Sequence, residues 1–276
     1  MRKKIALFVP NYDGNISGKT THSMLTACQS VHHVSINSGG MSLLARNFNT
    51  GFLAALMGGF DYFVMLHSDI GASNVVTNTP WIDSLVQDCE TMKCAVLSVV
   101  IPLKNDTGVT SLALSLDRTN KYEIRRVTMK ELVKLPIDFI CREDVCEIFG
   151  LDPDQAGALY INTGFMCVNL RDFDWKGQKF PGFSIDDRIY WSPEGQPLPY
   201  TLSEDWGFSL WVTMQGWPVF ATKRYPATHF GGKDYSNQEI WGEEHEPHVS
   251  YVDPIKYEAG LVRLEENFAK VPGRQV

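Results

Sequence analysis

Apolar and polar positions alternate in blocks along the first 105 residues. Continuous apolar runs are typical of strands that a sheet buries on both faces. Such runs cover residues 5–9, 31–36, 62–66 and 94–101. Between them, apolar residues at helical spacing predict helices over 20–30, over 43–56 with Ser42 as N-cap, and from Pro80 onward. Strand–helix repetition of this kind predicts right-handed βαβ units and a Rossmann-like, mostly parallel sheet flanked by helices.

The pattern changes after Pro102. Residues 174–200 are rich in proline, glycine and aromatic residues, which predicts a long loop. The other predicted elements are a sheet-edge strand over 109–116, a buried strand over 161–170, a helix over 204–215 and a short strand over 217–220. Neither a repeat nor a linker divides the chain, so we expect one α/β domain over 1–276 with an elaborated C-terminal half. We divide it into a first half over 1–105, a second half over 106–233 and a tail over 234–276.

Composition and charge narrow the class of protein. The chain has 276 residues, of which 44% are hydrophobic, as in folded proteins. A net charge of -7 argues against a nucleic-acid binder that is basic as a whole. Residues 118–134 nevertheless form a local basic stretch, which predicts either a solvated face or contact with an anionic acceptor. Six cysteines without paired spacing, no signal peptide and no membrane-length apolar segment predict a cytoplasmic protein.

Polar residues follow two of the buried strands directly. The run 62–66 ends in His67-Ser68-Asp69, and the first strand ends in Pro10-Asn11-Tyr12-Asp13. Open α/β sheets bind ligands at the carboxyl ends of their strands. In extended chain His67 and Asp69 point the same way, toward one metal ion or phosphate. The alternative is a strand that stops in a polar turn.

Three further segments carry candidate chemistry. Arg46 lies in an apolar helix and can reach solvent or a diphosphate. The strand over 161–170 opens with Asn162-Thr163-Gly164, where glycine permits close approach of a ligand or forms a bulge. Glu204-Asp205 precede an apolar helix face and are either first-turn carboxylates or a general base.

The later part of the chain contains three notable tryptophans and a loop that begins with a histidine. Trp206, Trp211 and Trp217 predict either an apolar wall against a ligand or core packing. The loop His229-Phe230-Gly231-Gly232-Lys233 combines a nitrogen ligand for a metal with a lysine suited to phosphate.

Taken in order, these motifs resemble glycosyltransferases of the GT-A fold, near the large family-2-like group. The resemblance runs from about residue 4 to 233. It implies that residues 1–105 form the nucleotide-binding half and that residues 106–233 form the acceptor and catalytic half. The matching segments are Pro10-Asn11-Tyr12-Asp13, His67-Ser68-Asp69 in place of D-x-D, Asn162-Thr163-Gly164, Glu204-Asp205-Trp206 and His229. Ala45-Arg46-Asn47 and residues 101–104 are similar to a branch common in viral and phage-type enzymes.

The resemblance implies a nucleoside-diphosphate sugar as donor, with a UDP-sugar expected, and a divalent metal, Mn²⁺ or Mg²⁺. It assigns the metal to Asp69, His229 and His67. Because His67 replaces an acid and brings no negative charge, metal binding would rest chiefly on Asp69. The donor-binding residues would be Pro10, Asn11, Tyr12, Asp13, Arg46, His67, Ser68 and Lys233. The sugar and acceptor side would comprise Asn162, Thr163, Gly164 and Trp206.

For catalysis the resemblance implies Asp205 as general base of an inverting transfer, with Glu204 as the second choice. The loop after His229 is also similar to the tail motif of some retaining GT-A families, in which case Asp205 would only orient a substrate. The expected acceptor is a saccharide, a lipid-linked glycan or a hydroxymethylated DNA base. A sugar-phosphate nucleotidyltransferase and a non-catalytic nucleotide-sugar binding module remain alternatives, and the oligomeric state stays open.

Overall fold

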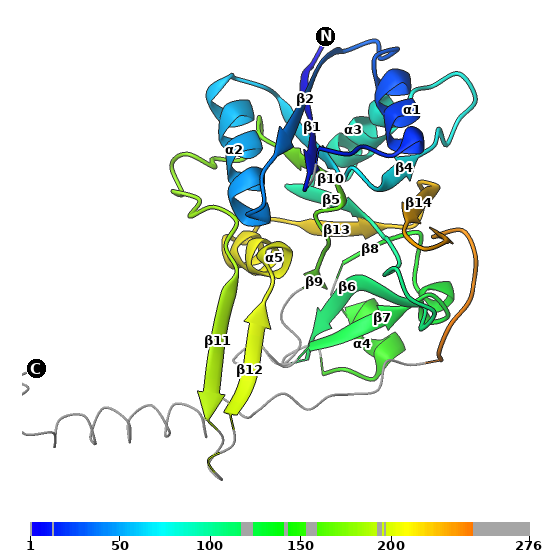
Figure 1. Ribbon diagram of the computed structural model, residues 1–276, viewed down its shortest axis with the longest axis vertical. Coiled ribbons are helices and arrows are strands. Elements are labelled where there is room, and N and C mark those ends of the chain that lie inside the picture. The colour runs from blue at the N-terminus through cyan, green and yellow to red at the C-terminus, as the bar shows by residue number, and fades with distance from the viewer. Residues whose placement is uncertain are drawn as a thin grey trace, which may run out of the picture.

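The computed structural model describes residues 2–12, 14–116, 124–140, 143–152, 159–191, 195 and 197–244. Within these ranges the chain has a mixed α/β fold with five α-helices around a seven-stranded sheet. Figure 1 shows this sheet at the centre of the molecule. None of the described helices has the length and apolar character that a membrane span requires.

The central sheet has the strand order β2-β1-β3-β10-β5-β13-β8. Its strands are β1 (Lys4–Asn11), β2 (His33–Gly40), β3 (Tyr62–Leu66), β5 (Val96–Val99), β8 (Asp138–Phe139), β10 (Phe165–Asn169) and β13 (Val219–Thr222). Strands β2, β1 and β3 are mutually parallel, and β13 is parallel to β5. Strand β10 lies antiparallel between β3 and β5, which therefore share a direction. Since β8 is antiparallel to β13, the sheet is mixed, with five strands in one direction.

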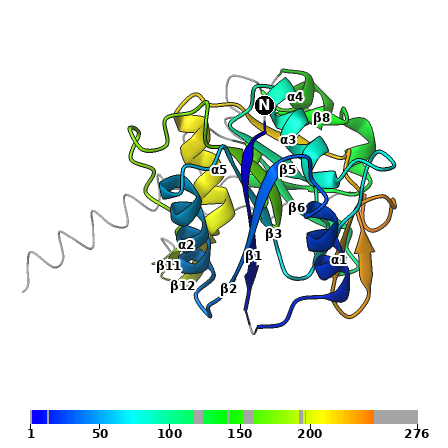
Figure 2. The ribbon, with the colours of Figure 1, turned by 90° about the horizontal axis from the view of Figure 1, so that it is seen from above.

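Helices cover both faces of this sheet. They are α1 (Gly18–Ala27), α2 (Leu44–Met57), α3 (Trp81–Thr91), α4 (Glu143–Phe149) and α5 (Glu204–Met214), with a 3-10 helix η1 (Glu131–Lys134). Figure 2 shows α2 and α5 on one side and α1 and α3 on the other. Successive strand residues point to opposite faces. Thus Phe8 joins the core under α2, whereas Leu7 and Val9 join the core under α3.

Three smaller sheets surround the central one. The sheet β15-β14-β4 comprises β4 (Ile70–Ala72), β14 (Ala227–Phe230) and β15 (Asp234–Ser236). The sheet β7-β6-β9 comprises β6 (Val109–Ser115), β7 (Ile124–Thr128) and β9 (Leu159–Tyr160). The third is the hairpin of β11 (Asp186–Trp191) and β12 (Pro197–Leu202), which projects from the body in Figure 1 and leads into α5.

Three local expectations from the sequence are wrong. The region 174–200 is not one loop, because it contains β11 and most of β12. Strand β6 does not lie at a sheet edge, because β7 and β9 pair with it on both sides. Ser42 does not cap α2: the N-cap is Leu43, which makes no side-chain capping bond.

An aromatic cluster fills the space between α2, α5 and the segment after β10. The rings of Trp175 and Trp217 lie 4.9 Å apart, and those of Phe183 and Phe208 lie 4.7 Å apart. Trp211 also packs on Trp175 at 5.9 Å. Core packing, one of the two roles expected from the sequence, is therefore the role of Trp211 and Trp217.

Candidate functional site

Three of the sequence motifs meet at one edge of the central sheet. The parallel strands β1 and β3 end there, and the antiparallel strand β10 begins there. The backbone N–H of His67 donates to the carbonyl of Gly164 at 2.8 Å, and that of Ser68 donates to the carbonyl of Pro10 at 3.2 Å. The polar residues that follow these strands are thereby held side by side.

Pairing of β14 with β4 brings His229 to Asp69. His229 lies opposite Ile70, and the backbone N–H of Phe230 donates to the carbonyl of Asp69 at 2.8 Å. The Nδ1 atom of His229 lies 2.9 Å from the carbonyl oxygen of Pro102, so Nδ1 carries the proton. Its Nε2 atom lies 3.5 Å from Oδ2 of Asp69. The imidazole is thus oriented by one hydrogen bond and presents its other nitrogen to the carboxylate.

Lys104, which the site prediction did not include, also binds Asp69. Its Nζ atom pairs with Oδ2 of Asp69, the same oxygen that faces His229. Burial alone would raise the pKa of Asp69, but the neighbouring His229 and the ammonium of Lys104 hold it well below its usual range. Asp69 is therefore an ionised carboxylate at neutral pH. The only sequence signal for Lys104 was its place in the segment 101–104.

His67 is a neutral imidazole. Burial lowers its pKa to about 4, and its ring packs against Phe48 at 5.2 Å. Its Nε2 atom is buried and has no hydrogen-bond partner among the described residues. Across the described ranges no group of three or more His, Cys, Asp or Glu side chains could hold a metal ion. The predicted metal set of Asp69, His229 and His67 thus has no support as a three-ligand site.

The exit of β1 is held in place by side-chain amides. Oδ1 of the buried Asn11 accepts the backbone N–H of Gly14 at 3.0 Å. Nδ2 of Asn47 donates to the carbonyl of Gly39 at 2.7 Å and lies 3.4 Å from that of Asn11. Tyr12, by contrast, is 71% exposed. The structure therefore leaves the Tyr12 ring free for a ligand at a fixed strand end; Asp13 lies outside the described residues.

Neither Arg46 nor Lys233 forms an ion pair or hydrogen bond with Asp69 among the described residues. Arg46 is exposed on α2, and its side chain makes no polar contact with the described residues. The exposed Lys233 pairs with Asp106, and its Nζ lies 5.2 Å from the ring centre of Tyr235. A donor contact by either residue remains a prediction.

The residues before β10 connect this edge to α5. Nδ2 of Asn162 donates to the carbonyl of Val99 at 2.9 Å. One residue earlier, the N–H of Ile161 donates to Oγ of Ser209 at 3.0 Å, and this hydroxyl donates to the carbonyl of Asp205 at 2.7 Å. The first turn of α5 is thereby fixed to the same strand that carries the Asn162 segment.

The Asn162 segment itself is buried. Asn162 is 3% exposed and Thr163 2% exposed. A Cβ atom on Gly164 would come within 2.8 Å of the Ile70 side chain, so glycine permits the close packing of this turn against β4. These residues support the site from within, and their predicted sugar contacts remain predictions.

Asp205 is a half-buried carboxyl group with one occupied oxygen. Its Oδ1 accepts hydrogen bonds from the Ser203 hydroxyl and from the backbone N–H of Trp206, the latter at 2.9 Å. Its Oδ2 has no partner among the described residues. Burial, followed by the like charge of Glu204, raises the pKa of Asp205 to about 7. Burial also raises the pKa of the buried Glu204.

The free energy of unfolding should depend on pH because Asp205 titrates with a raised pKa. An unfolded aspartate has a pKa of about 3.9, so between about pH 4 and pH 7 the folded protein binds more protons than the unfolded chain. The free energy of unfolding of the wild-type protein therefore falls as the pH rises through that interval. Asp205→Asn cannot ionise, so its free energy of unfolding relative to wild type should grow by about 1–3 kcal/mol between pH 5 and pH 8. Urea unfolding at both pH values measures this difference, and an equal difference at both would contradict the shifted pKa.

Trp206 is buried against the β6–β7 sheet, and its contact with a sugar or acceptor remains a prediction. It is 6% exposed, and its Nε1–H points to the carbonyl of Ser111 at 3.3 Å. The guanidinium of Arg126 lies 4.7 Å from the centre of its ring. Its contacts are therefore those of a packing residue between α5 and the β6–β7 sheet.

The described part of the basic stretch is largely paired within the protein. Arg125 pairs with the buried Glu131, and Lys130 pairs with Glu244 at 2.9 Å. Arg126 lies against Trp206. These contacts favour a structural role over a free cationic surface for DNA, and they leave the DNA acceptor without support; residues 117–123 lie outside the described ranges.

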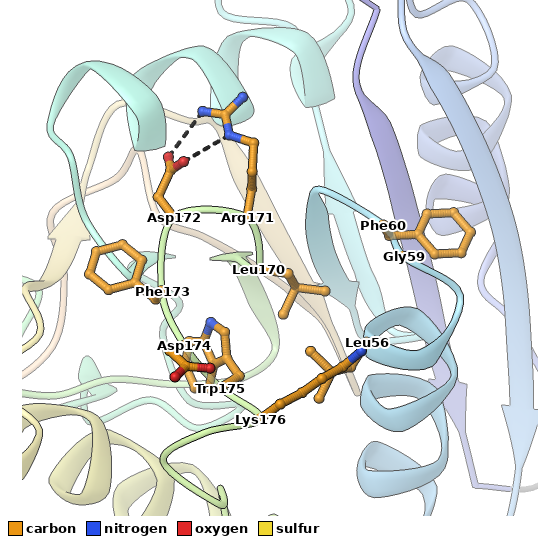
Figure 3. A pocket seen from close by; sticks show the side chains of 10 residues that line it. All are labelled: Leu56, Gly59, Phe60, Leu170, Arg171, Asp172, Phe173, Asp174, Trp175 and Lys176. Atoms are coloured by element: carbon orange, nitrogen blue, oxygen red, sulfur yellow. Dashed lines mark hydrogen bonds and ion pairs between the residues drawn. The ribbon is translucent and has the colours of Figure 1, made fainter.

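An open pocket of about 460 Å³ lies at the opposite edge of the sheet. Figure 3 shows it between the end of α2 and the segment that follows β10. It is lined by residues just before β3 and just after β10: Leu56, Gly59, Phe60 and residues 170–176. Because Asp69 follows the other end of β3, this pocket is separate from the candidate site.

No protein-family model matches the chain, and no curated protein matches it significantly. Among solved structures, A197 from STIV is similar over 92% of this chain and 100% of that one, with 14% identity and a TM-score of 0.47. HddC from Yersinia pseudotuberculosis is similar over 76% of this chain and 79% of its own, with 9% identity and a TM-score of 0.26. HddC complexed with GMP-PN gives 8% identity over 76% and 99%, with a TM-score of 0.30. Similarities this weak carry no argument about function, which must rest on the site itself.

Proposed function

We propose that this protein is a GT-A-type glycosyltransferase that moves a sugar from a nucleoside-diphosphate sugar, with UDP-sugar as the expected donor, to an acceptor hydroxyl. One observation carries the proposal. A carboxylate, Asp69, faces the oriented imidazole of His229 at one edge of the sheet. Hydrogen bonds through Ser209 and Ile161 hold the backbone of Asp205, whose carboxyl group has a raised pKa, to the segment that leads into β10 at the same edge. Binding a charged leaving group and removing a proton are the two tasks that glycosyl transfer requires.

The spacing of Asp69 and His229 supports the proposal of a divalent ion held by two protein ligands. Two ligands at about 2.1 Å from one ion and at angles of 90–110° are about 3.0–3.5 Å apart. Nε2 of His229 and Oδ2 of Asp69 lie 3.5 Å apart, and the Nδ1 bond to Pro102 orients the ring. The protein would supply these two ligands, and donor diphosphate and water the others. A bound Mn²⁺ or Mg²⁺ would neutralise charge on the leaving diphosphate.

The donor nucleotide would lie against the end of β1. The exposed Tyr12 offers an aromatic face for the base, and the bonds of Asn47 and Gly14 fix the strand end beneath it. The neutral His67, with its buried Nε2, is suited to hydrogen bonding rather than to charge pairing.

Asp205 would act as the general base. Its Oδ1 is occupied by Ser203 and Trp206, so Oδ2 would accept the proton of the acceptor hydroxyl. The acceptor oxygen then bonds the anomeric carbon while the bond to the diphosphate oxygen breaks and its electron pair leaves with the diphosphate. A base with a pKa near 7 is well matched to proton transfer at neutral pH. Inversion of the anomeric centre follows from direct attack, and a product that keeps the donor configuration would remove the base role.

Thermal unfolding with UDP, GDP, CDP and dTDP, each with and without Mn²⁺, tests the donor site. A ligand at 100 times its dissociation constant stabilises the folded state by about 2.7 kcal/mol, which here corresponds to roughly 5–10 °C. We expect a shift of that size with UDP that requires Mn²⁺. If none of the four nucleotides raises the melting temperature, the glycosyltransferase proposal fails.

The nucleotidyltransferase alternative receives no comparable support. It needs a glycine-rich loop with a free cation after β1. Lys19, the cation of that segment, pairs with Asp234 at 2.6 Å and lies 4.6 Å from the centre of the Phe230 ring. These contacts direct Lys19 toward the β14–β15 hairpin.

A further inference from the structure

The lysine bound to Asp69 has no role in the function proposed above. Lys104 lies on the segment that leaves β5, next to the bridge between Pro102 and Thr110. Its ammonium pairs with Oδ2 of Asp69, and Nε2 of His229 faces the same oxygen. The ammonium therefore binds the oxygen that a divalent ion would need.

An ammonium and a divalent cation cannot share this oxygen without strong repulsion, because both are positive and would be only a few ångströms apart. Binding of the ion at Asp69 and His229 thus requires Lys104 to leave. The lysine side chain is 37% exposed, so it can rotate toward the open side of the site. A diphosphate bound to the ion would lie within reach of the released ammonium, which binds phosphate as a mobile point charge.

We propose that Lys104 is an exchangeable cation: it holds Asp69 in the empty site, yields that position to the metal ion, and then binds the donor diphosphate. This inference rests on the proposed glycosyltransferase function. In the transfer step Lys104 forms and breaks no covalent bond; it provides positive charge to the departing diphosphate oxygens. It also makes metal and nucleotide binding mutually dependent, because the nucleotide offers the displaced lysine a new partner.

A substitution at Gly231 tests this exchange independently of Lys104 itself. A Cβ atom there would lie 3.0 Å from Cδ and 3.3 Å from Cβ of Lys104. Glycine thus allows the lysine stem to lie across the loop after β14 while its ammonium reaches Asp69. Gly231→Ala should displace the stem by a few tenths of an ångström and so weaken the pair with Asp69, but leave the ammonium available to a diphosphate.

Mn²⁺ binding to the full-length protein without nucleotide tests the first half of the proposal. Free Mn²⁺ is measured by its electron paramagnetic resonance signal. Removing one charge-assisted hydrogen bond to Asp69 should tighten Mn²⁺ binding about tenfold in Lys104→Met. Gly231→Ala should tighten it in the same direction, and Lys104→Arg should leave it near wild type. Unchanged or weaker Mn²⁺ binding in Lys104→Met would overturn the proposal.

UDP binding at saturating Mn²⁺, measured by calorimetry, tests the second half. Lys104→Met should bind UDP about tenfold more weakly, whereas Gly231→Ala should retain wild-type affinity. If wild type binds UDP equally well in EDTA and Lys104→Met does not, Lys104 replaces the metal and the exchange proposal is overturned. If no nucleotide binds wild type at all, the proposed function and the diphosphate role both fail, while the Mn²⁺ titration still decides whether Lys104 competes with the ion.

Discussion

Asp205→Asn should lower the rate of sugar transfer by about 10²- to 10⁴-fold while leaving Mn²⁺-dependent UDP binding intact. The asparagine amide oxygen can still accept the Ser203 hydroxyl and the Trp206 N–H that hold Oδ1. Only the group at Oδ2 loses its ability to take a proton. Transfer rates with saturating donor and acceptor, together with UDP affinity by calorimetry, separate the loss of proton transfer from a loss of binding.

Glu204→Gln is the matched control. Glu204 is the preceding acid on the same helix, and burial raises its pKa as well. Adjacent helical residues point about 100° apart, so only one of the two can face the acceptor. We expect the glutamine variant to keep its rate within about tenfold of wild type. A large loss in Glu204→Gln with little loss in Asp205→Asn would reassign the base.

The pH–rate profile gives a second check on Asp205. Its carboxylate form must take the proton, so the wild-type rate should rise with pH and level off above about 7. A rate that is constant from pH 5 to 8 would contradict proton transfer to a group with this pKa.

The first half of the fold could be predicted because its signals are local. The apolar run of β3 and the helical spacing of α2 each depend on neighbouring residues, and both elements lie where the sequence predicts them. The hairpin of β11 and β12 could not, because Pro197 and Pro199 weaken the strand signal of β12.

In the candidate site, too, some residues could be predicted from local sequence and others could not. Asp69 could be predicted from its place after β3 alone. Its contact with His229 arises from the pairing of two short strands, β4 and β14, that are more than 150 residues apart, and Lys104 reaches it from a loop. In α2 the prediction named Arg46, and the structure adds Asn47 to the residues around the end of β1. A turn of about 100° per residue leaves Arg46 exposed and brings Asn47 to the strand end.

Asp69→Asn should weaken Mn²⁺-dependent UDP binding by about 100-fold or more, because the variant loses the anionic ligand and keeps only the imidazole of His229. The asparagine has nearly the same shape, and the backbone bond from Phe230 to residue 69 does not involve the side chain. UDP titration by calorimetry at a fixed Mn²⁺ concentration measures the loss. The same titration of Ser68→Ala separates loss of the metal ligand from loss of the neighbouring predicted donor contact, because the described bonds of Ser68 use its backbone and should survive.

The double variant of Asp69→Asn and His229→Asn decides whether both residues hold one ion. If they do, removing either ligand already destroys the site, and the double variant should be no weaker than the worse single variant. Independent roles would instead multiply the two losses. A multiplicative result would leave Asp69 as an electrostatic partner of Lys104 and would assign His229 to a separate contact with the donor. The distance of 3.5 Å between Nε2 and Oδ2, with Nδ1 held by Pro102, leads us to expect the non-additive outcome.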